Sequence, residues 1–230
     1  MKVYEIRLKV FLLRDIPLNE AQSKIISFLD LGFFFDEKLS EYHKQKSYKG
    51  YSVGLFWPIE NDKLYKKECI YTITVRTIVP ELVKYFTDVC VHTETAFMKG
   101  LVADVKIIPK KHIESLHLLT PAVIKDSRGY WRQYMSAEEY ENRIKVNLLK
   151  QWNYFEGEKL DEDFNLFYMI EFYNKKPISV EYKNIKLLGD KFKIYISDDL
   201  RAQNLAYMAI GTGILENTSR GFGSANYRWL

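Results

Sequence analysis

Two hydrophobic periods alternate along this chain, and their order constrains the fold more than any other feature of the sequence. From Tyr4 to Leu12 every second residue is apolar, which is typical of a strand with one face in the core. After Pro17, apolar residues recur at helical spacing from Ala21 to Leu29. The rest of the first half predicts strands at 51–57 and 69–77, a helix that begins at Pro80, and a strand at 101–108.

The second half of the chain repeats the order strand, helix, strand, strand, helix, strand. Its elements are expected as a strand that opens 112–124, a helix with a capping box at Ser136 and Glu139, extended segments at 163–173 and 178–196, a helix capped by Asp198 or Asp199, and a closing strand at 222–229. This order predicts an α+β protein of two tandem ferredoxin-like (RRM-like, βαββαβ) domains. We place the domains at 1–110 and 111–230.

Composition narrows the function classes without choosing one. The chain has 34 Lys and Arg against 30 Asp and Glu, a formal charge of +4, which does not by itself indicate a polyanion partner. No apolar run is long enough for a membrane span. The two cysteines are far apart and no His, Cys or carboxylate cluster has metal-ligand spacing, so we expect a cytoplasmic protein with no metal and no cofactor.

The C-terminal segment is rich in glycine and follows a predicted helix. Its first two glycines resemble the start of a dinucleotide-binding fingerprint, but that motif needs a strand before it and a third glycine. The segment 220–227 also resembles an RNA-recognition signature, without the aromatic residue at Ser224. Helix-capping glycines in an ordinary loop are the alternative.

A phosphate-binding role would use the small size of glycine, because main-chain N–H groups can then approach an anion closely. Asn217, Ser219 and Arg220 would add donors beside the glycines. The residues expected to bind RNA in this segment are Gly211, Gly213, Asn217, Ser219, Arg220, Gly221 and Gly223.

A second candidate RNA-binding stretch is 125–134, in which basic and aromatic residues alternate. Lys125, Arg128 and Arg132 could pair with phosphates, while Tyr130, Trp131 and Tyr134 could stack on bases. An amphipathic hairpin explains the same pattern equally well.

Of the four histidines, His43 is the best candidate for chemistry. It lies after the first predicted helix in a stretch with Lys44, Lys46 and Lys49, where cations attract phosphate and an imidazole can exchange a proton near neutral pH. A histidine in a basic loop is also often only solvated. His92, His112 and His117 are expected at a helix end or within a strand.

Three stretches together resemble a family of CRISPR-associated endoribonucleases that cut precursor repeat RNA. The most specific is the terminal pattern with Gly211, Gly213 and the sequence GFG at 221–223. The other two are LLTPAVI at 118–124 and HKQKSYKGYSVGLF at 43–56. This chain departs from the commonest form of the family by the residues Thr-Ser-Arg at 218–220, before GFG.

The resemblance implies an enzyme that cleaves within CRISPR repeats without a metal. The RNA 2′-hydroxyl would attack the adjacent phosphorus and leave a 2′,3′-cyclic phosphate and a 5′-hydroxyl. His43 would act as general base or general acid, and Lys49 would stabilise the charge that builds on the phosphorane. Some members add a tyrosine from the first helix, which here offers Phe28; Tyr42 and Tyr48 are nearby candidates.

Two other functions fit the same pattern. The first is a non-catalytic subunit of a CRISPR ribonucleoprotein complex that binds repeat RNA. The second is a pair of regulatory domains that bind a small metabolite in a closed apolar pocket, which would give no salt-dependent RNA affinity. The expected partners are CRISPR repeat RNA and other subunits of an interference complex, with no membrane, and a homodimer is compatible with the sequence.

Overall fold

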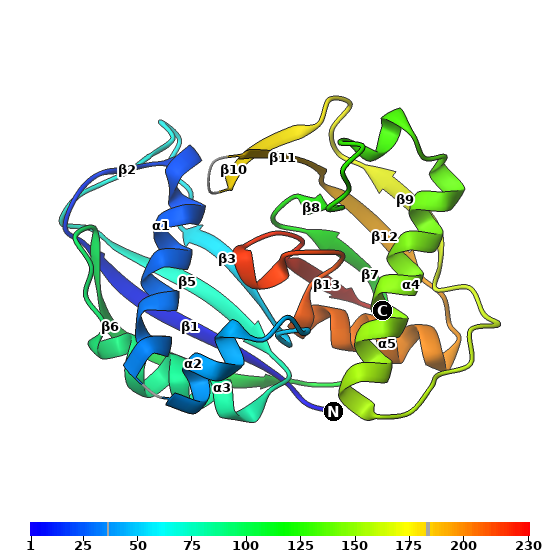
Figure 1. The fold of residues 1–230 in the computed structure, drawn as a ribbon, viewed down its shortest axis with the longest axis horizontal. Coiled ribbons are helices and arrows are strands. Elements are labelled where there is room, and N and C mark those ends of the chain that lie inside the picture. Colours follow the sequence, from blue (N-terminus) through cyan, green and yellow to red (C-terminus); the bar gives the residue numbers. More distant parts are fainter. Residues whose placement is uncertain (36, 183–184) are drawn as a thin grey trace.

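The structure, a computed structural model, describes residues 1–35, 37–182 and 185–230. Two four-stranded antiparallel sheets lie side by side, one from each half of the chain (Figure 1). Their strand orders are β3-β5-β1-β6 and β13-β7-β12-β9. In both sheets the first and third strands of the unit are central, so each half has the ferredoxin-like βαββαβ topology and the predicted fold class is confirmed.

The first sheet and its helices come from residues before 109. The elements are β1 (Val3–Leu12), β2 (Ile16–Pro17), α1 (Leu18–Leu31), η1 (Gly32–Phe35), α2 (Glu37–Lys44), β3 (Tyr51–Trp57), β4 (Leu64–Tyr65), β5 (Ile70–Thr77), α3 (Pro80–Lys84), η2 (Tyr85–Val89), η3 (Cys90–His92) and β6 (Met98–Ile108). β1 pairs with both β5 and β6, and this register turns Ile6, Leu8 and Val10 into the core, where each is fully buried.

The second sheet begins after residue 112. The elements are β7 (Ile113–Leu118), β8 (Ala122–Val123), η4 (Trp131–Gln133), α4 (Ala137–Glu156), β9 (Phe167–Phe172), β10 (Ile178–Tyr182), β11 (Ile185–Asp190), β12 (Phe192–Ile196), α5 (Leu200–Thr212), η5 (Thr218–Arg220) and β13 (Ala225–Trp229). The capping box of Ser136 and Glu139 is present at the start of α4, and Asp199 caps α5.

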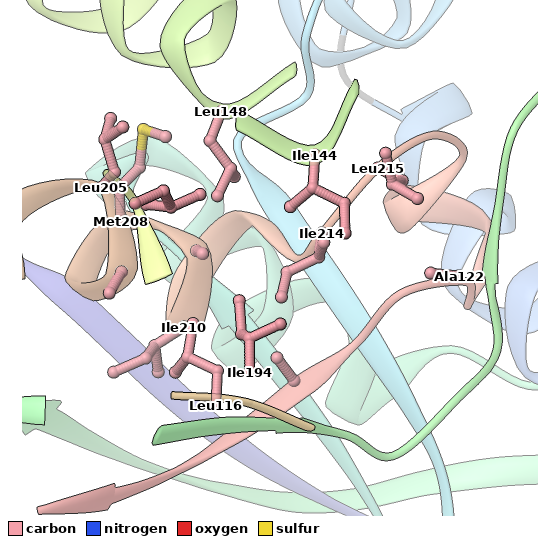
Figure 2. Close-up of a cluster of buried hydrophobic side chains, with 14 of the residues drawn as sticks. Leu116, Ala122, Ile144, Leu148, Ile194, Leu205, Met208, Ile210, Ile214 and Leu215 are labelled. Carbon is pink, nitrogen blue, oxygen red and sulfur yellow. The ribbon is translucent and has the colours of Figure 1, made fainter. Parts of the chain in front are cut away.

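Helices α4 and α5 pack against the second sheet to form the second core. Figure 2 shows Ile144 and Leu148 of α4 and Leu205 and Met208 of α5 gathered with Ile210 above the sheet residues Leu116 and Ile194. Three residues of the first half, Val3, Ile78 and Ile108, belong to the same cluster. The two halves therefore share buried apolar surface, and the division at 110 and 111 into separate domains stays a prediction.

Two expectations about secondary structure were wrong. The segment 178–196 does not form one extended unit: β12 joins the main sheet, whereas β10 and β11 form a hairpin that continues onto β8. A close approach explains the branch, since a Cβ at Gly189 would lie 2.4 Å from the Ala122 carbonyl oxygen. His43 lies in the short helix α2, where the sequence predicted a loop.

Candidate active site

The site forms where the loop between α5 and β13, which we call the glycine-rich loop (residues 213–224), docks against the first half of the chain. The Ser52 hydroxyl donates to the Gly211 carbonyl at 3.2 Å, and the Thr218 hydroxyl donates to the Tyr51 carbonyl at 3.2 Å. In Figure 1 the helical turn of this loop lies beside β3. These contacts fix the loop next to α1 and α2, the helices that precede β3.

His43 lies against this loop, with a side chain that is only 15% exposed. Arg220 in the loop approaches it from one side, with a guanidinium nitrogen 3.4 Å from His43 Nε2. Asp30, at the end of α1, faces the other ring nitrogen, with Oδ1 3.8 Å from Nδ1. The Phe33 ring stacks on the imidazole at 5.0 Å between centroids. The structure thus brings together a histidine and an arginine from opposite halves of the chain.

The surroundings favour a neutral imidazole. Burial lowers the pKa of His43 below 6.5, Asp30 acts in the opposite direction, and the charges of Arg220 and Lys49 lower it further. Since a guanidinium can only donate, the contact with Arg220 requires a lone pair on Nε2, which places the proton on Nδ1, toward Asp30. In this state Nε2 is the basic atom.

Asp30 and Arg220 form an ion pair next to the histidine. Burial opposes the charge of Arg220, but Asp30 and Tyr51 outweigh it and raise the pKa of the guanidinium. A second contact holds the loop backbone, because Gln22 Nε2 donates to the Arg220 carbonyl at 2.8 Å. The arginine is therefore both charged and held in place.

Lys49 contacts the end of the helix that carries His43. Its ammonium donates to the carbonyl oxygens of Tyr42 and Gln45, the latter at 2.7 Å, and so caps α2. Burial, followed by the charge of Arg220, lowers the pKa of Lys49. The Tyr42 hydroxyl in turn donates to the Lys49 carbonyl. In this structure Lys49 positions α2, and its catalytic role stays a prediction.

The glycines do not present free N–H groups, which corrects one part of the sequence interpretation. Gly213, Gly221 and Gly223 donate to the carbonyls of Ala209, Thr218 and Pro121 at 2.8, 3.1 and 2.9 Å. Gly211 lies in the last turn of α5 and is buried. The N–H groups of Gly213, Gly221 and Gly223 are therefore already bonded within the chain, and RNA binding by the four glycines stays a prediction.

Close packing and backbone conformation explain why glycine is present in the loop. Gly213, Gly221 and Gly223 have φ values of +78°, +84° and +58°. At Gly223 a Cβ would lie 2.0 Å from the Ile214 carbonyl oxygen. Among the polar neighbours, Asn217 has φ +60° and Ser219 lies close enough to the Tyr51 hydroxyl to lower its pKa against the dominant effect of burial.

The stretch 125–134 differs from the expected interface. Tyr130 and Trp131 are only 8% and 6% exposed and both donate to buried Asp190, so base stacking by these two rings is wrong. Arg132 lies 3.8 Å from Asp190, and Arg128 is paired with Asp126 at 2.8 Å. The Lys125 backbone N–H donates to Glu216. Phosphate contacts by Lys125, Arg128 and Arg132 stay predictions.

The other three histidines lie away from this arrangement. His92 ends η3, His112 pairs with Asp198 at 3.0 Å, and His117 is in β7. Across residues 1–35, 37–182 and 185–230, no three His, Cys, Asp or Glu side chains are grouped so that they could hold a metal ion. Within the same ranges, no helix combines the length and the apolar character that crossing a membrane requires.

Sequence reasoning missed Asp30, Phe33 and Gln22 as members of this site. All three lie in or just after α1, where they read as ordinary helix residues. One signal was available: Gln22 is polar but lies among the buried residues of α1, with Ala21 and Ile25. The sequence could not show that α1 meets Arg220, which is 190 residues from Asp30.

Fold and site together define a two-unit ferredoxin-like protein with a half-buried histidine beside a glycine-rich loop. The model of a family described as CRISPR associated protein Cas6, C-terminal, matches residues 104–227. The chain therefore belongs to the Cas6 family of CRISPR repeat-RNA-processing proteins. A comparison with the sequences of curated proteins gives no match.

Solved structures agree with this fold over nearly the whole chain. A protein described as CRISPR associated protein Cas6 has 21% identity and a TM-score of 0.65, covering 98% of this chain and 99% of the other. An RAMP protein binding different RNA substrates has 16% identity, a TM-score of 0.70 and the same coverage. A Cas6-related protein from Pyrococcus furiosus has 19% identity, a TM-score of 0.64 and 98% coverage of both chains.

Proposed function

We propose that this protein is an endoribonuclease that cleaves precursor CRISPR RNA within its repeats, without a metal, by attack of a 2′-hydroxyl. The observation that carries the proposal is the contact of His43 with Arg220 at 3.4 Å, on a family scaffold that processes repeat RNA. One similar structure is described as an RNA-binding RAMP protein and another as a Cas6 product complex. RNA is the substrate class that these relatives suggest.

His43 would act as the general base. Nε2 takes the proton of the 2′-hydroxyl, the 2′-oxygen forms a bond to phosphorus, and the bond from phosphorus to the 5′-oxygen breaks. The leaving 5′-oxygen takes a proton from solvent. The products are a 2′,3′-cyclic phosphate and a 5′-hydroxyl. A pKa below 6.5 suits this assignment, because most of the histidine is then unprotonated at neutral pH.

Arg220 and Lys49 would supply positive charge to the phosphorane. In the free protein Arg220 occupies the lone pair of Nε2, so the substrate phosphate must draw the guanidinium away before His43 can accept a proton. Lys49 would likewise exchange a backbone carbonyl for a phosphate oxygen. Each exchange replaces a neutral acceptor with an anionic one, which favours it electrostatically.

The same two contacts favour the second candidate function, a non-catalytic subunit that binds repeat RNA. If Arg220 stays on Nε2 and Lys49 stays on the end of α2, the protein could hold RNA without cutting it. Cleavage in the presence of EDTA separates the two functions.

The test uses repeat RNA and the matched variants His43→Ala and His92→Ala. His43→Ala should reduce the cleavage rate in EDTA by roughly 10²- to 10⁴-fold, because it removes a general base, with binding retained. His92 is exposed at the end of η3, so its variant should cut like the wild type. No cleavage by the wild type would favour the binding subunit, and loss of cleavage on adding EDTA would contradict the metal-free mechanism.

Several expectations about the setting stay predictions. They are a cytoplasmic location, the absence of a cofactor, association with other subunits of an interference complex, and a homodimer.

A further inference from the structure

A cavity of about 410 Å³ lies beside His43, between α1 and the β10 strand of the hairpin. Its lining includes Gln22, Ile26, Asp30, Glu181, Tyr182 and Arg220, together with two serines of α1. This volume falls in the range of small-molecule sites, about 300 to 1,000 Å³. Neither His43 nor Lys49 lines it, so the proposed chemistry does not explain the cavity.

The cavity shares Asp30 and Arg220 with the candidate active site. A phosphate held by the Arg220 guanidinium next to His43 would therefore have one of its neighbouring nucleotides at the mouth of the cavity. An aromatic ring and an apolar side chain, Tyr182 and Ile26, offer surfaces for a base that has left its stack. Single-stranded RNA is commonly recognised through such unstacked bases.

The charge of the lining selects a base over a second phosphate. Glu181 is exposed, and within the described parts of the chain its carboxylate forms no ion pair and no hydrogen bond, while Lys186 lies opposite it in the β10–β11 ladder. Among the described residues that line the cavity, the Asp30 carboxylate is paired with Arg220, so Glu181 carries the remaining charge. A free carboxylate repels phosphate and accepts hydrogen bonds from N–H groups.

Guanine fits this acceptor best. Its Watson–Crick edge presents two adjacent donors, N1–H and the 2-amino group, which match the two oxygens of a carboxylate. Adenine and cytosine place a ring-nitrogen lone pair beside their amino group, and uracil places two carbonyl oxygens beside its one donor, so each would oppose a carboxylate oxygen. We propose that the cavity binds the unpaired guanine of a nucleotide next to the cut and that Glu181 reads its Watson–Crick edge. This inference rests on RNA binding at His43.

The test measures binding, so it does not depend on cleavage. In a His43→Ala background, repeat RNAs in which single guanines are replaced by inosine, which lacks the 2-amino group, are titrated by fluorescence anisotropy. One inosine position should lower the affinity roughly tenfold, and this loss should disappear when Glu181→Gln is added. The control Glu94→Gln removes one exposed carboxylate elsewhere and should keep the tenfold loss.

Inosine also weakens pairs within an RNA stem, but such losses persist in the Glu181→Gln protein and are thereby recognised. The proposal is overturned if no inosine position is sensitive to Glu181→Gln. If the wild-type protein shows this guanine preference but does not cut RNA, the proposed nuclease activity is contradicted and the proposed guanine site is supported. If the protein cuts RNA without this preference, the nuclease activity is supported and the guanine site is contradicted.

Discussion

His43 lies between two charged residues that shift the pKa of its imidazole in opposite directions. Asp30 raises the pKa of the imidazole, Arg220 lowers it, and burial gives the largest downward shift. Because the folded-state pKa is below 6.5, the unfolded chain binds more protons in the window just below that value. This histidine therefore makes the protein less stable as the pH falls through 6.5, and the same shift keeps the base active at mildly acidic pH.

Two variants should shift the pKa of His43 in opposite directions. Asp30→Asn should lower the pKa of His43 further, since it removes the anion, and Arg220→Gln should raise it, since it removes a nearby cation. The measurement is an NMR titration of the histidine ring protons, with His43 assigned from the His43→Ala spectrum. The acid limb of kcat/KM should move in the same two directions. Shifts of the same sign in both variants would contradict the electrostatic account.

At the scale of elements, the glycine-rich loop acts through its shape. The N–H groups of Gly213, Gly221 and Gly223 bond within the chain, and these glycines permit left-handed backbone and close contacts. The loop thereby holds the Arg220 side chain against α1 and α2, where the guanidinium pairs with Asp30 and contacts His43. A glycine motif can position a side chain instead of binding an anion itself.

Gly223→Ala should destabilise the protein by roughly 3 kcal/mol, because the new Cβ meets the Ile214 carbonyl oxygen in a left-handed backbone. Gly157 is the matched control: it also has positive φ, at +74°, but its Cβ would meet nothing within 4 Å. Gly157→Ala should cost only about 1 kcal/mol. Urea unfolding measures both values, and equal losses would show that packing in the loop is unimportant.

Most elements could be predicted because their signals are local. The alternation in β1, the Ser136 capping box of α4 and Asp199 before α5 each depend on neighbouring residues. The separation of β10 and β11 from β12 depends instead on the pairing of β11 with β8, in which Gly189 lies opposite Val123, far apart in the chain. The helix α2 has mainly polar residues, and Leu39 and Tyr42 are too few to form a recognisable apolar stripe.

The candidate site could be predicted only in part for the same reason. His43 and the glycine motif carry the family pattern within short stretches of sequence. The contact of His43 with Arg220 joins residues 177 positions apart, and the role of Asp30 follows only from that contact. Tyr130 and Trp131 looked like a base-stacking surface because composition does not show that Asp190 is buried beside them.

For the whole molecule, the two halves are joined by more than the linker. Tyr207 of α5 donates to the Ile108 carbonyl at 2.6 Å and accepts from the Val3 N–H at 3.2 Å, so one side chain of the second half bonds to the ends of the neighbouring strands β1 and β6. The shared core around Val3 and Ile108 surrounds these bonds. We therefore expect the halves to unfold together.

Tyr207→Phe should lower the free energy of unfolding by about 1 to 3 kcal/mol, because it leaves the buried Val3 N–H without its partner. Tyr168→Phe is the control, as that ring is 69% exposed. Circular dichroism and tryptophan fluorescence should give one coincident transition in both proteins. Two separate transitions in the wild type would instead support domains at 1–110 and 111–230 that fold independently.

The proposed function depends on one claim, that the RNA supplies its own nucleophile and that His43 removes the proton from it. The most direct measurement offers the protein a repeat RNA with a single 2′-deoxy sugar immediately upstream of the cut, in EDTA, beside the all-ribose RNA. We predict that the all-ribose RNA is cut to a 2′,3′-cyclic phosphate and that the 2′-deoxy RNA is bound but stays intact. Equal cutting of both RNAs would contradict the mechanism.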